Sequence, residues 1–181
     1  FAIASTLAFA ADWPQWRGPS RDAVASDVPA KWPEKLTAKW KIKVGEGHSS
    51  PIFAAGRIFS FARDRDREVL RAVDPAAGKI VWEQSYAAPY EMNGAATAHG
   101  KGPKSTPAYA GGRVYTFGIS GILACWDAAI GKQVWTRSFD KKYKGTSPTF
   151  GTAMSPVVWN ETVYAHVGTD GDGAMTAFDA K

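Results

Sequence analysis

The sequence lacks the features that would cross-link the chain or place it in a membrane. Its 181 residues contain one cysteine, Cys125, so no disulfide can form within the chain and stability must come from packing. No apolar run approaches the roughly 18 residues of a membrane-spanning helix, and we expect no integral membrane span. No stretch repeats apolar residues at the helical period of 3.6, which argues against a helical solenoid.

Charge of one sign is not concentrated in the sequence either. The net charge is +5, but basic and acidic residues alternate, as in R-D-R-D-R-E at residues 63–68. Because nucleic-acid-binding proteins usually gather their basic residues on one face, we expect no nucleic-acid partner. The one basic cluster, Lys141, Lys142 and Lys144, is more typical of a solvated loop than of an anion site.

What the sequence does contain is an internal repeat. Residues 72–82, A-V-D-P-A-A-G-K-I-V-W, recur at residues 125–135 as C-W-D-A-A-I-G-K-Q-V-W, and a third copy begins at residue 177 as A-F-D-A-K. A second anchor is a Ser-Pro or Thr-Pro pair that precedes a β-branched residue by a constant distance. Its prolines are Pro51, Pro107 and Pro156, and the β-branched residues are Ile58, Val114 and Val163.

One repeat predicts two antiparallel β-hairpins. Residues 69–74 and 80–86 are rich in β-branched and aromatic side chains, and the Pro and Gly-Lys between them supply turn chemistry. The preceding half-repeat predicts two short strands around a turn at Ala55-Gly56, with equivalent turns at Gly111-Gly112 and Asn160-Glu161. Each repeat therefore holds four strands.

The repeat length indicates the architecture. The proline anchors are separated by 107 − 51 = 56 and 156 − 107 = 49 residues, and four-stranded units of this length are typical of propeller blades. The small residues at equivalent positions, Ala72, Cys125 and Ala177, suit blades stacked face to face. We predict an all-β fold, a β-propeller of four-stranded antiparallel blades, of which this sequence is a fragment with about three of the seven or eight blades expected.

The predicted organisation has three parts. Residues 1–11 are small and apolar, with an A-x-A site at residues 8–10, which indicates the remnant of a secretory signal peptide and a periplasmic or secreted protein; a frayed apolar N-terminus is the alternative. Residues 12–37 form an extended leader whose Trp13 and Trp16 pack onto the propeller. Residues 38–181 form the partial propeller, expected to be a monomeric ring when complete. It comprises a closing strand at 38–44, blades at 49–86 and 105–139, and an incomplete blade at 154–181.

The repeated pattern A-x-D-x-x-x-G-K-x-x-W resembles the tryptophan-docking motif of the pyrroloquinoline-quinone (PQQ) type β-propellers. In that family, the tryptophan of the outermost strand of one blade lodges against the neighbouring blade. The resemblance covers residues 38–181 and implies structural docking roles for Trp82 and Trp135. Trp40, in the predicted closing strand, would be the docking residue of the last blade.

The predicted binding surface is the face that carries the long loops. The links between blades and the loops joining the two hairpins of a blade emerge together on this face, and such loops carry function more often than the blades do. Its candidate ligand-binding residues are His48, Ser49, Asn93, His99 and Lys104. The two histidines suit a ligand or a metal, although loop histidines more often satisfy backbone groups, and we assign no metal site.

No catalytic residue is assigned. The resemblance implies that family dehydrogenases stack PQQ between a tryptophan and a disulfide of adjacent cysteines, with Ca²⁺ beside a catalytic aspartate. This sequence has no Cys-Cys pair and no C-x-x-C-H haem motif. We therefore predict an exported scaffold that binds an unknown protein or small molecule without an assigned cofactor. A PQQ- and Ca²⁺-dependent alcohol or sugar dehydrogenase is the alternative.

The same family holds the propeller lipoprotein of the outer-membrane barrel-assembly machinery, which implies a third role in envelope assembly. That lipoprotein carries a lipid-attachment cysteine directly after its signal peptide. The residue after Ala10 in this chain is Ala11, which disfavours anchoring by that route.

Overall fold

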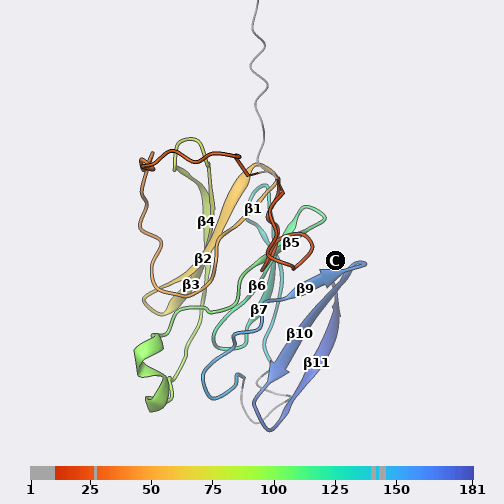
Figure 1. The fold of residues 1–181 in the computed structure, drawn as a ribbon. Coiled ribbons are helices and arrows are strands. Elements are labelled where there is room, and N and C mark those ends of the chain that lie inside the picture. The colour runs from red at the N-terminus through yellow and green to blue at the C-terminus, as the bar shows by residue number, and fades with distance from the viewer. Residues whose placement is uncertain (1–10, 27, 140–141, 143–145) are drawn as a thin grey trace, which may run out of the picture.

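A computed structural model describes residues 11–26, 28–139, 142 and 146–181. Three antiparallel sheets stand side by side like the blades of a fan (Figure 1). Blade 1 contains β1 (Ile52–Ala54), β2 (Arg57–Asp64), β3 (Arg67–Val73) and β4 (Ile80–Ala87); blade 2 contains β5 (Ala108–Ala110), β6 (Arg113–Phe117), β7 (Leu123–Asp127) and β8 (Gln133–Arg137); blade 3 contains β9 (Val157–Trp159), β10 (Thr162–Gly168) and β11 (Gly173–Asp179). The predicted all-β propeller class is confirmed.

The inner hairpin of every blade closes with the same two-residue turn. Both residues of each turn have positive φ: 49° and 69° at Ala55-Gly56, 56° and 77° at Gly111-Gly112, and 47° and 57° at Asn160-Glu161. This conformation defines the type I′ turn, whose twist matches that of the two strands it joins. The three turns lie where the sequence predicted them, even where no glycine is present.

The outer hairpins of blades 1 and 2 also share one turn geometry. Asp74 Oδ1 accepts hydrogen bonds from the backbone N–H groups of Ala76 (2.8 Å) and Ala77 (3.0 Å). Asp127 Oδ1 accepts equivalent bonds from Ala129 (2.9 Å) and Ile130 (3.1 Å). The aspartate of the repeat therefore holds the turn closed with its own side chain, which is why it recurs at a fixed distance from the tryptophan.

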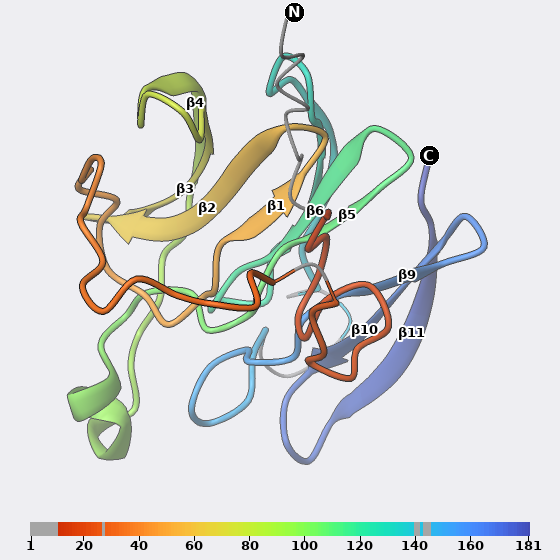
Figure 2. The same cartoon turned by 45° about the horizontal axis from the view of Figure 1, so that its top comes forward.

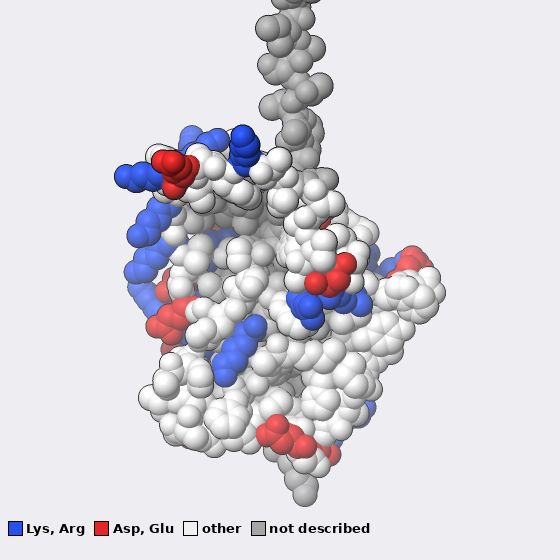
Figure 3. Space-filling model, in the orientation of Figure 1, with Lys and Arg blue, Asp and Glu red and all other residues white. Residues whose placement is uncertain are grey.

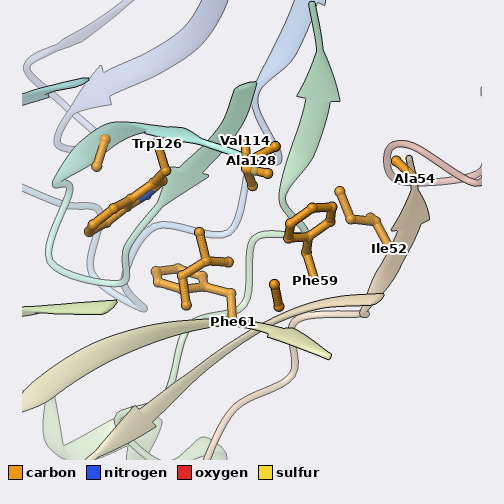
Figure 4. Packing of buried hydrophobic residues seen from close by; sticks show 10 residues of the cluster. Ile52, Ala54, Phe59, Phe61, Val114, Trp126 and Ala128 are labelled. Carbon is orange, nitrogen blue, oxygen red and sulfur yellow. The ribbon is translucent and has the colours of Figure 1, made fainter. Parts of the chain in front are cut away.

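The core lies between the blades rather than within one sheet. One buried cluster fills the space between blades 1 and 2, with Phe59 and Phe61 of β2 facing Val114 of β6 and Trp126 of β7 (Figure 4). A second cluster between blades 2 and 3 contains Phe117, Leu123 and Val163. Each blade thus buries its apolar side chains only by stacking on a neighbour, which is the packing expected of a propeller.

Two of the three repeat tryptophans dock in the same way. The Nε1–H of Trp82 donates to the carbonyl oxygen of Ala128 in blade 2 at 3.1 Å, and that of Trp40 donates to the carbonyl oxygen of Pro75 in blade 1 at 2.9 Å. Each ring lies directly over a glycine of the neighbouring turn, Gly131 beneath Trp82 and Gly78 beneath Trp40. Trp135 packs on the second core cluster, and its buried Nε1 has no hydrogen-bond partner among the described residues.

The leader crosses the inner edge of the fan and binds two blades through its backbone. Trp13 exchanges backbone hydrogen bonds with Phe53 of β1, and the N–H of Tyr109 in β5 donates to Pro14 O at 2.7 Å. Trp13 is partly buried, whereas Trp16 is 55% exposed. The expected packing of Trp16 onto the propeller is therefore incomplete.

Three segments lie outside the pattern that the blades share: residues 38–44, the connection between β2 and β3, and the link between blades 1 and 2. Residues 38–44 belong to no described strand, so their role as a closing strand stays a prediction. Only residues 65–66 connect β2 and β3, because Arg63, whose side chain is buried, belongs to β2 and Arg67 begins β3. The link between blades 1 and 2 contains a short 3₁₀ helix, η1 (Gly94–His99), that the sequence analysis missed.

Two further predictions concern the N-terminal signal-peptide remnant and the absence of a membrane-spanning helix. The predicted signal-peptide remnant lies outside the described residues, except for Ala11. In the part of the chain that the structure describes, no helix has the length and apolar character needed to cross a bilayer.

Candidate functional site

The innermost strands of the three blades begin side by side, and a repeated hydroxyl links them. The N–H of Ser50 donates to Thr106 Oγ1 at 3.3 Å, and the N–H of Thr106 donates to Ser155 Oγ at 2.9 Å. These residues directly precede the prolines that mark the repeat. The Ser/Thr-Pro anchor is therefore a blade-to-blade contact, and it brings the loops before β1, β5 and β9 to one place.

A hollow of about 370 Å³ opens at this place. The leader forms one wall and the starts of the three innermost strands form the other; Figure 2 shows the leader looping in front of β9 and β10. The lining residues are Trp16, Arg21, His48, Ser50, Lys104, Thr106, Ala153, Met154, Ser155 and Val157. An aromatic ring, two basic side chains and a histidine thus line one cavity.

The two cations of the hollow are held by neutral oxygens. Arg21 donates from Nε and Nη2 to Gln15 Oε1 at 3.0 and 2.9 Å, and Lys104 Nζ donates to the carbonyl oxygen of Phe150 at 2.6 Å. The ion pairs of the described residues all lie elsewhere. Because no carboxylate neutralises either charge, the hollow is electropositive and favours an anionic group.

The predicted histidine pair exists, but it is tied to backbone. His48 Nε2 lies 3.0 Å from the carbonyl oxygen of His99, and the two ring centroids are 6.4 Å apart. A carbonyl oxygen only accepts, so His48 Nε2 carries a proton and its Nδ1 remains the atom available to a ligand. The backbone N–H groups of His48 and Ser49 both donate to Pro103 O, which fixes this loop against the link between blades 1 and 2.

The five predicted site residues do not form one site. His48 and Lys104 line the hollow, and His99 supports it from behind. Ser49 lines a different, apolar hollow against blade 1, and Asn93 caps η1 by accepting from the N–H of Ala95 at 2.9 Å. Trp16 and Arg21 also line the hollow, and they are not among the predicted residues because they lie in the leader, where no repeat assigns a position to them.

The described residues do not supply the set that PQQ and Ca²⁺ need in the family. Cys125 is the one cysteine of the sequence, so no pair of adjacent cysteines can face a quinone. Its side chain is buried inside blade 2. Among the residues the structure describes, no three His, Cys, Asp or Glu side chains are grouped closely enough to hold a metal.

Cys125 should behave as a packed side chain and not as a reactive thiol. Burial raises the pKa of Cys125 to about 11, so the thiolate that reacts with alkylating reagents is scarce near neutral pH. We expect no labelling of the native protein by iodoacetamide at pH 8 and complete labelling in denaturant, as read by intact mass. Rapid labelling of the native protein would contradict this placement.

Comparison with known proteins places the chain in a family. The family model described as outer membrane protein assembly factor BamB matches residues 65–181, more than half of the chain. The chain belongs to this family of PQQ-like β-propellers. The predicted resemblance is thereby confirmed, and the matched region of the PQQ-like propeller includes β3 and β4 of blade 1 and all described strands of blades 2 and 3.

One of the similar solved structures supports this propeller fold. A quinohemoprotein alcohol dehydrogenase from Comamonas testosteroni aligns with a TM-score of 0.52 at 23% identity, covering 75% of this chain and 19% of the enzyme. A europium-containing methanol dehydrogenase aligns with a TM-score of 0.48 at 19% identity, covering 74% of this chain and 23% of the enzyme. BamB from Moraxella catarrhalis aligns with a TM-score of 0.39 at 16% identity, covering 75% of this chain and 46% of BamB.

The PQQ-like chain spans less than a quarter of the length of the two dehydrogenases and less than half of that of BamB. At these identities the likeness to the Comamonas enzyme shows the fold alone. No curated protein sequence matches the chain.

Proposed function

We propose that this PQQ-like β-propeller is a binding scaffold whose long-loop face receives an acidic group of a ligand or partner protein. The observation that carries the proposal is the hollow at the start of the innermost strands, where Arg21 and Lys104 face the cavity without a carboxylate partner. A carboxylate entering there would gain two charge-assisted hydrogen bonds. The ring of Trp16 offers an apolar wall beside it.

The rigid surroundings of the hollow suit recognition. The leader is joined to β1 and β5 by backbone hydrogen bonds, and the blades below it are joined through Thr106 and Ser155. A preformed site loses little conformational entropy when it binds, so modest contacts yield useful affinity. We also propose that the protein works outside the cytoplasm, periplasmic or secreted, since the description of its family names outer-membrane assembly.

Neutralising Lys104 should weaken binding of an acidic segment. A glutamate-rich peptide is expected to quench or shift tryptophan fluorescence through Trp16, and a matched glutamine-rich peptide is not. Lys104→Gln should reduce affinity for the acidic peptide about tenfold, the loss expected for one charge-assisted hydrogen bond. Lys101→Gln is the matched control, because Lys101 is a nearby exposed lysine outside the hollow.

Three results would overturn the proposal. Equal binding of the acidic and neutral peptides would show that the hollow does not recognise an acidic group. Equal losses of affinity in Lys104→Gln and Lys101→Gln would show the same. Reduction of a dye at enzyme-like rates on addition of PQQ, Ca²⁺ and a panel of alcohols would establish the dehydrogenase instead.

A further inference from the structure

The segment that runs from the end of the leader into the predicted closing strand is rich in lysine. Residues 28–43 contain five lysines and one glutamate, a net charge of +4, whereas the whole chain has +5. The lysines are Lys31, Lys35, Lys39, Lys41 and Lys43; all five are exposed, and we call them the basic strip. Figure 3 shows Lys and Arg side chains gathered along the edge of the molecule that the leader occupies in Figure 1.

The second half of the strip is oriented by packing. From residue 39 to residue 44 exposed and partly buried side chains alternate: the lysines point outward, and Trp40, Ile42 and Val44 are partly buried. These three apolar residues line one hollow together with Ile58 and Val73 of blade 1. The hydrogen bond from Trp40 to Pro75 O fixes the segment, so Lys39, Lys41 and Lys43 form a row on the outer surface.

The outward row stays exposed when another blade stands beside it. Trp135 is equivalent to Trp40, and its neighbours Val134 and Thr136 in β8 are equivalent to Lys39 and Lys41. Both β8 residues are exposed although blade 1 is stacked on blade 2. An outermost strand therefore presents this side to the surroundings within the fan, and the lysines remain accessible.

The first half of the strip adds exposed apolar side chains. Val28, Trp32 and Leu36 are 55%, 62% and 69% exposed, spaced four residues apart and interleaved with Lys31 and Lys35. No ion pair of the described residues involves a lysine of the strip. Exposed Trp and Leu side chains flanked by lysines are the combination that binds at a membrane interface, where the rings enter the headgroup region and the ammonium groups meet anionic lipid.

We propose that the basic strip, with Val28, Trp32 and Leu36, is a docking surface for an anionic lipid bilayer. The occupant is chosen by charge complementarity and by the apolar side chains, which a purely acidic protein surface would leave unpartnered. The surface lies in the leader and the predicted closing strand, separate from the hollow at Lys104. It needs no spanning helix and no lipid anchor, and it would hold the propeller at a membrane face.

This surface does not stand out in the sequence. The densest basic cluster there is Lys141, Lys142 and Lys144, of which the structure describes Lys142 alone. The lysines of the strip are spaced two or four residues apart, so they form no run in the sequence. They become one surface only because residues 28–43 lie along the edge of the fan.

Sedimentation with lipid vesicles tests the proposal. The full chain should sediment with phosphatidylcholine vesicles that contain phosphatidylglycerol, not with pure phosphatidylcholine vesicles, and high salt should release it. Each lysine near an anionic surface contributes about fivefold to partitioning, so Lys31→Gln/Lys35→Gln should lower it by more than about tenfold. Lys101→Gln/Lys132→Gln is the matched control, since both residues are exposed and outside the leader.

A spectroscopic readout separates insertion from simple charge attraction. Tryptophan emission should shift to shorter wavelength with the anionic vesicles, and Trp32→Ala should remove most of that shift while thermal unfolding is unchanged. Equal partitioning of the two lysine double variants would overturn the proposal. Binding to a glutamate-rich peptide through the strip, without binding to vesicles, would overturn it as well and identify an acidic protein as the partner.

Discussion

Replacing Gly131 with alanine is expected to lower the free energy of unfolding by about 3 kcal/mol and the Tm by about 6–12 °C. Gly131 has φ +73°, where an L side chain is strained, and an added Cβ would lie 2.7 Å from the ring of Trp82. The ring must therefore move, and the hydrogen bond from Trp82 to Ala128 O would be strained or lost with it. The effect reports directly on the docking of blade 1 against blade 2.

The chain offers a matched control for this substitution. Gly112 has nearly the same backbone angle, φ +77°, but an added Cβ would meet no atom within 4 Å. Gly112→Ala should therefore cost only the backbone strain, about 1 kcal/mol. Similar losses for the two variants, measured by urea denaturation, would show that the tryptophan contact contributes nothing beyond strain.

A double-mutant cycle sharpens the test. Trp82→Phe removes the larger ring system that lies over Gly131. In that background, Gly131→Ala should cost less than it does in the wild type, because the smaller ring leaves room for the added methyl group. An unchanged cost would mean that the methyl group acts on the turn alone.

The repeat explains why so much of the fold could be predicted. The aspartate and glycine of the outer turn, the two-residue inner turn and the Ser/Thr-Pro anchor are local signals, and the structure gives each one a local or adjacent-blade contact. The glycine of the outer turn is also needed for packing between segments. Gly78 leaves space for the ring of Trp40, and Gly131 leaves space for the ring of Trp82. Repetition made these contacts visible, because each occurs at least twice.

Features that occur once could not be predicted in this way. The alternating charges at 63–68 give no sign of burial, yet Arg63 and Glu68 are only 3% and 0% exposed. Their partners, Ala88 and Ile119, lie 25 and 51 residues away in the sequence. Likewise, Arg21 reaches the hollow from the leader, which has no repeat partner. Single long-range polar contacts leave no periodic signal.

Glu68 is the most consequential of these unpredicted residues. It lies in β3 of blade 1 and accepts hydrogen bonds from the backbone N–H of Ile119 in blade 2 at 2.7 Å and from the Tyr86 hydroxyl at 2.8 Å. Gly118 packs directly against its carboxyl group. Tyr86 in turn stacks on Trp126 of blade 2, with ring centroids 5.9 Å apart. One carboxyl group thus connects the two blades.

Removing this carboxyl group should be strongly destabilising. Glu68→Ala would leave a cavity and two donors without acceptors, so we expect the free energy of unfolding to fall by about 3–5 kcal/mol. Glu161→Ala is the control, because the Glu161–Lys181 ion pair is exposed on both sides, and about 1 kcal/mol or less should be lost. Equal losses in the two variants would show that Glu68 does not join the blades.

Glu68→Gln separates the charge from the hydrogen bonds and predicts a dependence on pH. Burial is the main cause that raises the pKa of Glu68 above 4.5, and it outweighs the lowering by the hydrogen bonds from Ile119 and Tyr86 and by the charge of Arg63. Between pH 4.5 and the raised pKa, the folded protein holds a proton that the unfolded chain releases. The stabilisation from Glu68 is therefore complete below pH 4.5 and declines as pH rises through the raised pKa.

The glutamine side chain is neutral at every pH and cannot show this decline. The free energy of unfolding of the wild type minus that of Glu68→Gln should therefore be greatest below pH 4.5. This difference should decrease as pH rises through the raised pKa of Glu68, as measured by denaturant unfolding over a pH series. A difference that widens with rising pH would mean that the folded protein favours the carboxylate. In that case the hydrogen bonds of Ile119 and Tyr86, and not burial, would dominate at the junction between blades 1 and 2.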